Sequence, residues 1–157
     1  MSRIWDKMTV LKPSAMAAVA QRRFDDAQTL CDTGMNARAN GAAYLAGFVV
    51  EILLKANLVR LYPWTARSSY HPVTAGERRI WDLVWRQHHL VDMLDQMASV
   101  QVSLKQKGQR DRHDYLGDLK KICATWTIHA RYSCSNIPMS ESRDMVERIR
   151  ILKELLK

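Results

Sequence analysis

The sequence predicts an all-α protein: an up-and-down antiparallel bundle of four to five main helices that forms one domain over residues 1–157. Apolar residues recur at three- and four-residue spacing over long stretches, and no stretch alternates for long enough to indicate a half-buried strand. Only 6 glycines and 4 prolines interrupt the chain, and a hydrophobic content of 47% supplies enough apolar area for one core.

Local signals place the individual elements. A proline after the N-terminal arm suits a first helical turn, and a glycine after the first helix can end it in a left-handed conformation. The second helix is apolar on more than one side, so we expect it at the centre of the bundle. A Thr-to-Glu spacing suited to a capping box starts a shorter helix, and the break between this helix and the next stays open. In order, the expected elements are an arm over 1–12, helices over 14–31 and 37–61, a long connecting loop over 62–76, a helix that begins near 74–77, a helical stretch around 90–97, a polar segment over 101–112 with a turn at Gly108, a helix over 111–133 and a last helix after Pro138.

The charge of the chain favours a polyanionic partner. The formal net charge is +8 and the pI is near 9.7, and each phosphate that a basic side chain neutralises releases counterions. The basic residues are spread along the chain, however, as they also are in globular proteins without a nucleic-acid role. No basic-then-apolar leader opens the chain, and the longest apolar stretch, 44–54, is interrupted by Glu51 and too short to span a bilayer. We therefore expect a cytoplasmic protein with no membrane segment.

The cysteines and the missing motifs exclude several classes of site. Cys31, Cys123 and Cys134 are odd in number and far apart, so we expect reduced thiols without a disulfide framework. The sequence contains no glycine-rich phosphate loop, no nucleophile elbow and no paired-histidine zinc helix. We expect no metal and no cofactor, and we interpret His88 and Asp92 as an exposed pair.

Three segments carry the most informative pattern. They are YLAGFVVEILLKA over 44–56, HLVDML over 89–94 and WTIHARYS over 126–133. In this order they resemble the HEPN domain family, respectively its second-helix signature, its short His-Leu segment and the Arg-Tyr ending of its penultimate helix. The resemblance covers about residues 14–157 and implies a helical bundle that commonly forms a homodimer.

The resemblance also implies a range of functions. Many HEPN domains are metal-independent ribonucleases in toxin-antitoxin, CRISPR-associated and phage-defence systems. Other members are inactive, or pair with small nucleotidyltransferase proteins. Two hypotheses follow for this chain: an RNA-associated module, or a protein-interaction module whose partner is a nucleotidyltransferase or another defence protein.

The ribonuclease members carry an Arg that is followed a few residues later by a His. Arg131 matches the Arg, but Asn136 stands where the His is expected. Arg can hold the scissile phosphate, whereas Asn can hydrogen-bond phosphate or ribose but cannot exchange a proton at pH 7. His129 lies two residues before Arg131, and about 100° per residue sends it to a different helix face. If the protein is active, it is a metal-independent endoribonuclease, and the missing His argues against activity.

The roles of the candidate site residues stay open. Arg131 is either a phosphate ligand or a structural cation paired near the end of the bundle. Glu51 either pairs with Lys55 one turn on, or is buried and needs a cation such as Arg131 to stay ionised, and we favour the second. With Tyr132, these residues form the expected binding set for nucleic acid or nucleotide.

Aromatic residues are a further candidate binding feature. Trp81, Trp85, Trp126 and Tyr132 lie at helical spacing, where aromatic side chains more often belong to the core or a dimer interface. The aromatic residues of the connecting loop, Tyr62, Trp64 and Tyr70, are freer to stack on bases.

Overall fold

The computed structural model describes residues 10–126 and 137–157. All of its regular elements are helices, which confirms the predicted all-α class, and the described residues contain one isolated antiparallel bridge, Val10 to Arg67, but no strand. The elements are α1 (Pro13–Asp32), α2 (Asn36–Leu61), the 3-10 helix η2 (Pro63–Ala66), α3 (Ala75–Trp85), α4 (Leu90–Asp95), α5 (Ala98–Asp111), α6 (Tyr115–Thr125) and α7 (Met139–Leu155).

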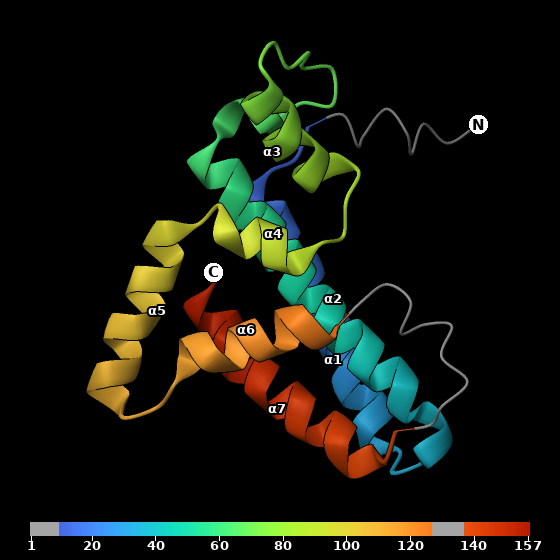
Figure 1. Cartoon of the computed structure of the whole chain (residues 1–157). Helices are drawn as coiled ribbons and strands as arrows, with labels where there is room; N and C mark the ends of the chain where they lie inside the picture. The colour runs from blue at the N-terminus through green and yellow to red at the C-terminus, as the bar shows by residue number, and fades with distance from the viewer. Residues whose placement is uncertain (1–9, 127–136) are drawn as a thin grey trace, which may run out of the picture.

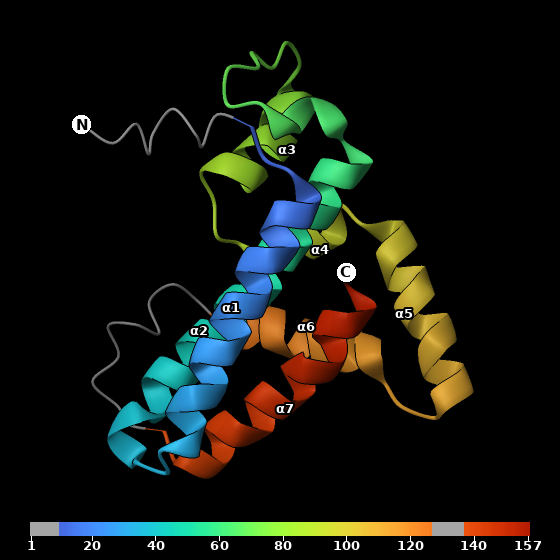
Figure 2. The same cartoon turned by 180° about the vertical axis from the view of Figure 1, so that it is seen from behind.

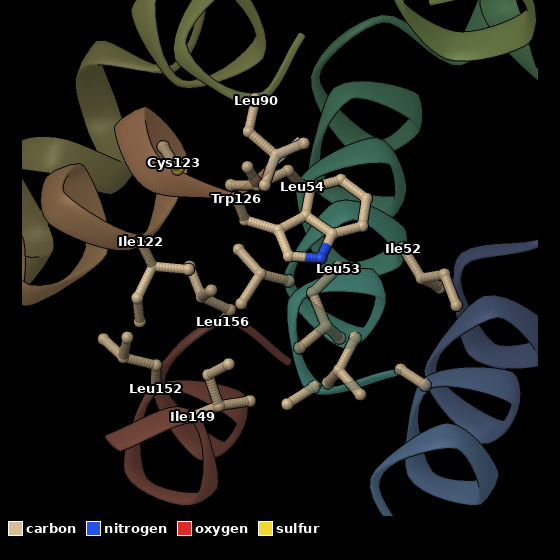
Figure 3. Packing of buried hydrophobic residues seen from close by; sticks show 14 of the residues in the cluster. Ile52, Leu53, Leu54, Leu90, Ile122, Cys123, Trp126, Ile149, Leu152 and Leu156 are labelled. Carbon is tan, nitrogen blue, oxygen red and sulfur yellow. The ribbon is translucent and has the colours of Figure 1, made fainter. Parts of the chain in front are cut away.

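Helix α2 is the centre of the molecule, as its apolar pattern predicts. α1 runs antiparallel along it, and α7 packs on the same pair (Figure 1, Figure 2). Figure 3 shows Leu53 and Leu54 of α2 on the side of α6 and α7, whereas Ile52 points toward α1. Among the described helices, α2 alone is long and apolar enough to cross a membrane, but 67% of its most apolar window is buried inside the protein, as in a core helix.

Polar contacts hold α7 on α2 at both of its ends. The backbone N–H of Met139, at the start of α7, donates to Asn36 Oδ1 at 3.1 Å, since Pro138 offers no side-chain cap. At the other end, Asn57 Nδ2 donates to the carbonyl of Leu156 at 2.7 Å. Side chains of α2 therefore satisfy backbone groups of α7 that the helix cannot satisfy itself.

The predicted helices in the first half of the chain are confirmed with small shifts at their ends. The structure also confirms the capping box: Thr74 Oγ1 accepts from the Glu77 N–H at 3.1 Å, and Glu77 Oε2 accepts from the Thr74 N–H at 3.1 Å. The predicted loop over 62–76 contains the short helix η2, and the end of the N-terminal arm pairs with it through the Leu11 N–H and the Ala66 carbonyl at 2.7 Å.

The predictions for the second half of the chain are partly wrong. The polar segment 101–112 is not a hinge region but belongs to α5, and Gly108 lies inside this helix, where its missing side chain makes room for the His113 carbonyl. The turn falls instead at Arg112, which has a left-handed φ of 56°. Asp114 then caps a new helix by accepting from the Gly117 N–H at 2.9 Å, so the predicted helix over 111–133 begins only at Tyr115.

That helix also ends earlier than predicted. α6 stops at Thr125, and Trp126 already has extended backbone angles (φ −79°, ψ 127°). The indole ring of Trp126 packs against α2, and α6 ends at the residue before it. Residues 127–133, the remainder of the predicted helix, lie outside the described residues.

Candidate functional site

The centre of the candidate site is a buried carboxylate on α2. The Glu51 side chain is 2% exposed, and its Oε1 contacts Lys55 Nζ at 2.9 Å and His88 Nδ1 at 2.8 Å. Its Oε2 is buried and has no hydrogen-bond partner among the described residues. Both alternatives for Glu51 thus hold in part: the carboxylate is buried, and it pairs with Lys55. The second side-chain partner that the structure describes is His88.

A pocket of about 460 Å³ lies beside this cluster, which we call the Glu51 cluster (Glu51, Lys55 and His88). One wall is the connection between α3 and α4 together with the first turn of α4, and it includes Arg86 and His88. The other wall is the end of α6, with Cys123 and Trp126. His88 therefore contacts the buried carboxylate and also lines an open pocket, since its side chain is 39% exposed.

Trp126 holds the α6 wall against α2. Its ring stacks on Tyr44, with centroids 5.9 Å apart, and its Nε1–H donates to the Tyr44 carbonyl at 3.2 Å. The indole lies directly over Gly47, where any Cβ atom would overlap the ring. Only glycine permits this close approach of an aromatic ring to the α2 backbone.

Described residues of the three segments that resemble HEPN domains lie close together, with Trp126 as the one described residue of the third. Gly47 and Glu51 come from the first segment, Leu90 and Asp92 from the second, and Trp126 begins the third. Figure 3 shows the same convergence in the core, where Leu90 and Trp126 lie against Leu54 of α2.

His88 contacts the buried carboxylate through Nδ1. The tautomer with its proton on Nδ1 donates to Glu51 and leaves Nε2 as an acceptor. His88 does not pair with Asp92 as predicted; His89 does, at 3.4 Å, while His88 turns inward to Glu51. Sequence reasoning missed the Glu51–His88 pair because the two residues are 37 positions apart and no spacing rule joins them.

The cysteines of the described chain do not offer a nucleophile. Burial, with a smaller contribution from the charge of Asp95, raises the pKa of Cys123 to about 12, so its thiol stays protonated near neutral pH. Cys31 is also buried and free, and burial raises its pKa. Cys134 lies outside the described residues. In the ranges 10–126 and 137–157, no group of His, Cys, Asp and Glu side chains could hold a metal ion.

Four of the predicted site residues, His129, Arg131, Tyr132 and Asn136, lie in 127–136, outside the described residues. The flanking residues that the structure describes both contact α2: Trp126 packs on Gly47, and the Ile137 N–H donates to Asn40 Oδ1 at 3.0 Å. The two remaining predicted site residues, Glu51 and Lys55, are brought together.

The fold and the site define the class of this chain as an all-α helical protein with a buried Glu–Lys–His cluster beside an open pocket. Comparison with family models, with curated proteins and with solved structures finds no match for the chain. The resemblance to HEPN domains stays a prediction from the sequence, as do the homodimer and the cytoplasmic location.

Proposed function

We propose that this chain is a cytoplasmic HEPN-like domain that associates with RNA in a toxin-antitoxin or phage-defence context and works as a homodimer. The observation that supports the proposal is the placement of described residues from the three segments: Leu90 and Trp126 line the pocket beside the Glu51 cluster, and Trp126 packs on Gly47 of α2. The net charge of +8 supports a polyanionic ligand.

The residue types of the predicted site favour binding over cleavage. Arg131 supplies a phosphate ligand, and Asn136 supplies a hydrogen bond without proton transfer. His88 is the described side chain best suited to acid–base work, because a buried carboxylate orients it and its ring lines the pocket. A weak, metal-independent ribonuclease activity would therefore depend on His88, and otherwise the domain binds RNA without cleaving it.

An assay with labelled single-stranded RNA in chelator tests the proposal. We expect binding whose affinity falls steeply between 50 and 200 mM salt, as counterion release from a single strand requires (about 300-fold for six contacts). Arg131→Ala should weaken binding, whereas Arg22→Ala, which removes the same charge from the exposed face of α1, should not. Slow cleavage by the wild type that is lost in His88→Ala would show that the domain is also a ribonuclease. Neither cleavage nor salt-sensitive binding by the wild type would refute the proposal.

A second candidate function is a protein-interaction module, and helix α5 is the observation that favours it. α5 stands apart from the α1–α2–α7 core and touches mainly α6 (Figure 1, Figure 2). Its Val102 side chain is 54% exposed. The partner would be a nucleotidyltransferase-type or another defence protein. Light scattering of the purified chain measures its oligomeric state. The mass of a single copy would contradict the homodimer.

A further inference from the structure

One end of the molecule combines arginines with aromatic rings. The end of α2, η2, the connection over 67–74 and α3 lie together there (Figure 1, Figure 2). Residues 60–86 contain five arginines but only two carboxylates, Glu77 and Asp82. Glu77 accepts hydrogen bonds from backbone N–H groups of residues 73 and 74, and Asp82 pairs with Arg86 at 3.6 Å.

Three of these arginines are available to a ligand. Arg67, Arg78 and Arg79 are exposed, and none has an acidic partner in the part of the chain that the structure describes. Both local carboxylates are already engaged, so this end presents guanidinium groups that a polyanion can reach. A guanidinium fork binds a phosphate through two hydrogen bonds.

Aromatic rings lie between the arginines. The rings of Trp64 and Tyr70 pack with centroids 4.9 Å apart, and Tyr62 meets Trp64 edge-on at 6.2 Å. Trp81 on α3 stacks on Trp85 at 6.2 Å. These rings are half-buried, so each keeps some of its surface in contact with solvent.

Contacts through side chains and through the Arg67 carbonyl connect these residues to one another and, through Arg86, to the pocket. The Arg67 carbonyl accepts from the Tyr70 N–H at 3.2 Å and from Trp81 Nε1–H at 3.4 Å. The Arg86 guanidinium lies over the Trp81 ring, 4.9 Å from its centroid, and Arg86 also lines the pocket. We call Trp64, Arg67, Tyr70, Trp81 and Arg86 the arginine–aromatic track.

We propose that the arginine–aromatic track binds single-stranded RNA and leads it to the pocket beside the Glu51 cluster. The proposal rests on the proposed function and names the surface that performs it. Bases stack on Trp64 and on the Arg86–Trp81 pair without regard to sequence, while phosphates meet Arg67 and the flanking Arg78 and Arg79. A duplex hides its base faces in the stack, so single strands are preferred. An acidic protein would use the arginines but would have no use for the aromatic faces.

Two sets of variants test the track by fluorescence anisotropy with a labelled 12-nucleotide single-stranded RNA. The triple variant Arg67→Gln, Arg78→Gln, Arg79→Gln should reduce the slope of log K against log salt by about 2, because each single-strand phosphate contact contributes about 0.7. Trp64→Leu and Trp81→Leu should each weaken binding by about 5- to 100-fold and leave that slope unchanged. The matched control is Arg22→Gln, Arg23→Gln, Arg38→Gln, which removes the same charge from α1 and the first turn of α2.

The outcomes separate the two proposals. If the wild type binds RNA but the track variants bind like the control, the track is wrong and the proposed function stands. If the wild type does not bind RNA, the proposed function fails first. Competition by polyglutamate as strong as by RNA, with no effect of the tryptophan variants, would make this end a general anion surface and overturn the inference. Thermal melts by circular dichroism check folding, and the exposed arginines carry the test even if a tryptophan variant unfolds.

Discussion

At the scale of single residues, Glu51 places a carboxylate in the middle of a core helix, where its desolvation opposes folding. Its carboxylate is almost fully buried, Lys55 and His88 contact the same oxygen, and the other oxygen has no hydrogen-bond partner among the described residues. Removing a carboxylate and an ammonium group from water costs several kcal/mol each, at about the scale of their mutual attraction. Apolar residues at these positions would therefore stabilise the fold about as well as the Glu51 cluster does. What the cluster adds is the orientation of His88.

This reasoning gives a stability prediction for the pair on α2. Glu51→Leu should lower the free energy of unfolding by about 3 kcal/mol, because it leaves Lys55, only 13% exposed, without its anion. Adding Lys55→Met should recover most of the loss, since the pair is then replaced by apolar side chains of similar size. Urea unfolding measures both variants. A double variant as unstable as Glu51→Leu would show that the ion pair itself stabilises the fold.

Gly47 gives a second prediction at this scale. Gly47→Ala should destabilise the protein by about 1 to 3 kcal/mol, because the new methyl group overlaps the indole of Trp126 and the α6 wall must move. Gly76→Ala is the matched control: the nearest atom to its Cβ is 3.9 Å away, so the change should stabilise α3 by about 0.5 to 1 kcal/mol. Equal effects on the urea midpoint would contradict the packing of Trp126 on Gly47.

At the scale of elements, the start of α3 makes a prediction about pH. Backbone N–H groups of Thr74 and Val73 lower the pKa of Glu77. Its pKa is thus lower in the folded than in the unfolded protein, so its contribution to stability is present above the unfolded value of about 4.3 and is lost as pH falls through the folded value. The stability difference between wild type and Glu77→Gln should be constant from pH 6 to 8 and shrink below about pH 4.

Thr74→Ala is the control for this measurement. The Thr74 hydroxyl does not titrate, so its loss should cost about 1 kcal/mol at every pH of the series. Thermal unfolding of the three proteins between pH 3 and 8 gives the comparison. A Glu77→Gln difference that persisted at the lowest pH would mean that the charge of Glu77 is not what stabilises the turn.

The elements also show where local signals suffice. The first two helices, the capping box and the last helix follow from proline, glycine and apolar spacing, because those signals act within a few residues. The errors in the described residues fall in 101–126. Gly108 was expected to form a hinge or turn, but it lies inside α5, where the absence of a side chain makes room for the carbonyl of His113. A glycine selected by such a tertiary contact looks the same in sequence as one that ends a helix.

At the scale of the whole molecule, the site could be predicted only in part. Glu51 and Lys55 lie one turn apart, so their pairing was among the alternatives that the sequence offered. His88 reaches Glu51 from another element, and only the packing of α3 and α4 against α2 brings it there. The sequence also marked the loop aromatics, but not their connection through Trp81 and Arg86 to the pocket.

The two hydrogen bonds between α2 and the ends of α7 have a consequence for the kinetics of folding. Asn36 and Met139 are separated by 103 positions, and Asn57 and Leu156 by 99. The α1–α2 hairpin forms through contacts that are local in sequence. The two hydrogen bonds between α2 and α7 join residues about 100 positions apart, so we expect them to form only after most of the chain is ordered. We expect refolding to be slower than for a bundle whose helices contact only their neighbours in sequence. In hydrogen exchange during refolding, we expect the side of α2 that faces α7 to become protected later than the side that faces α1.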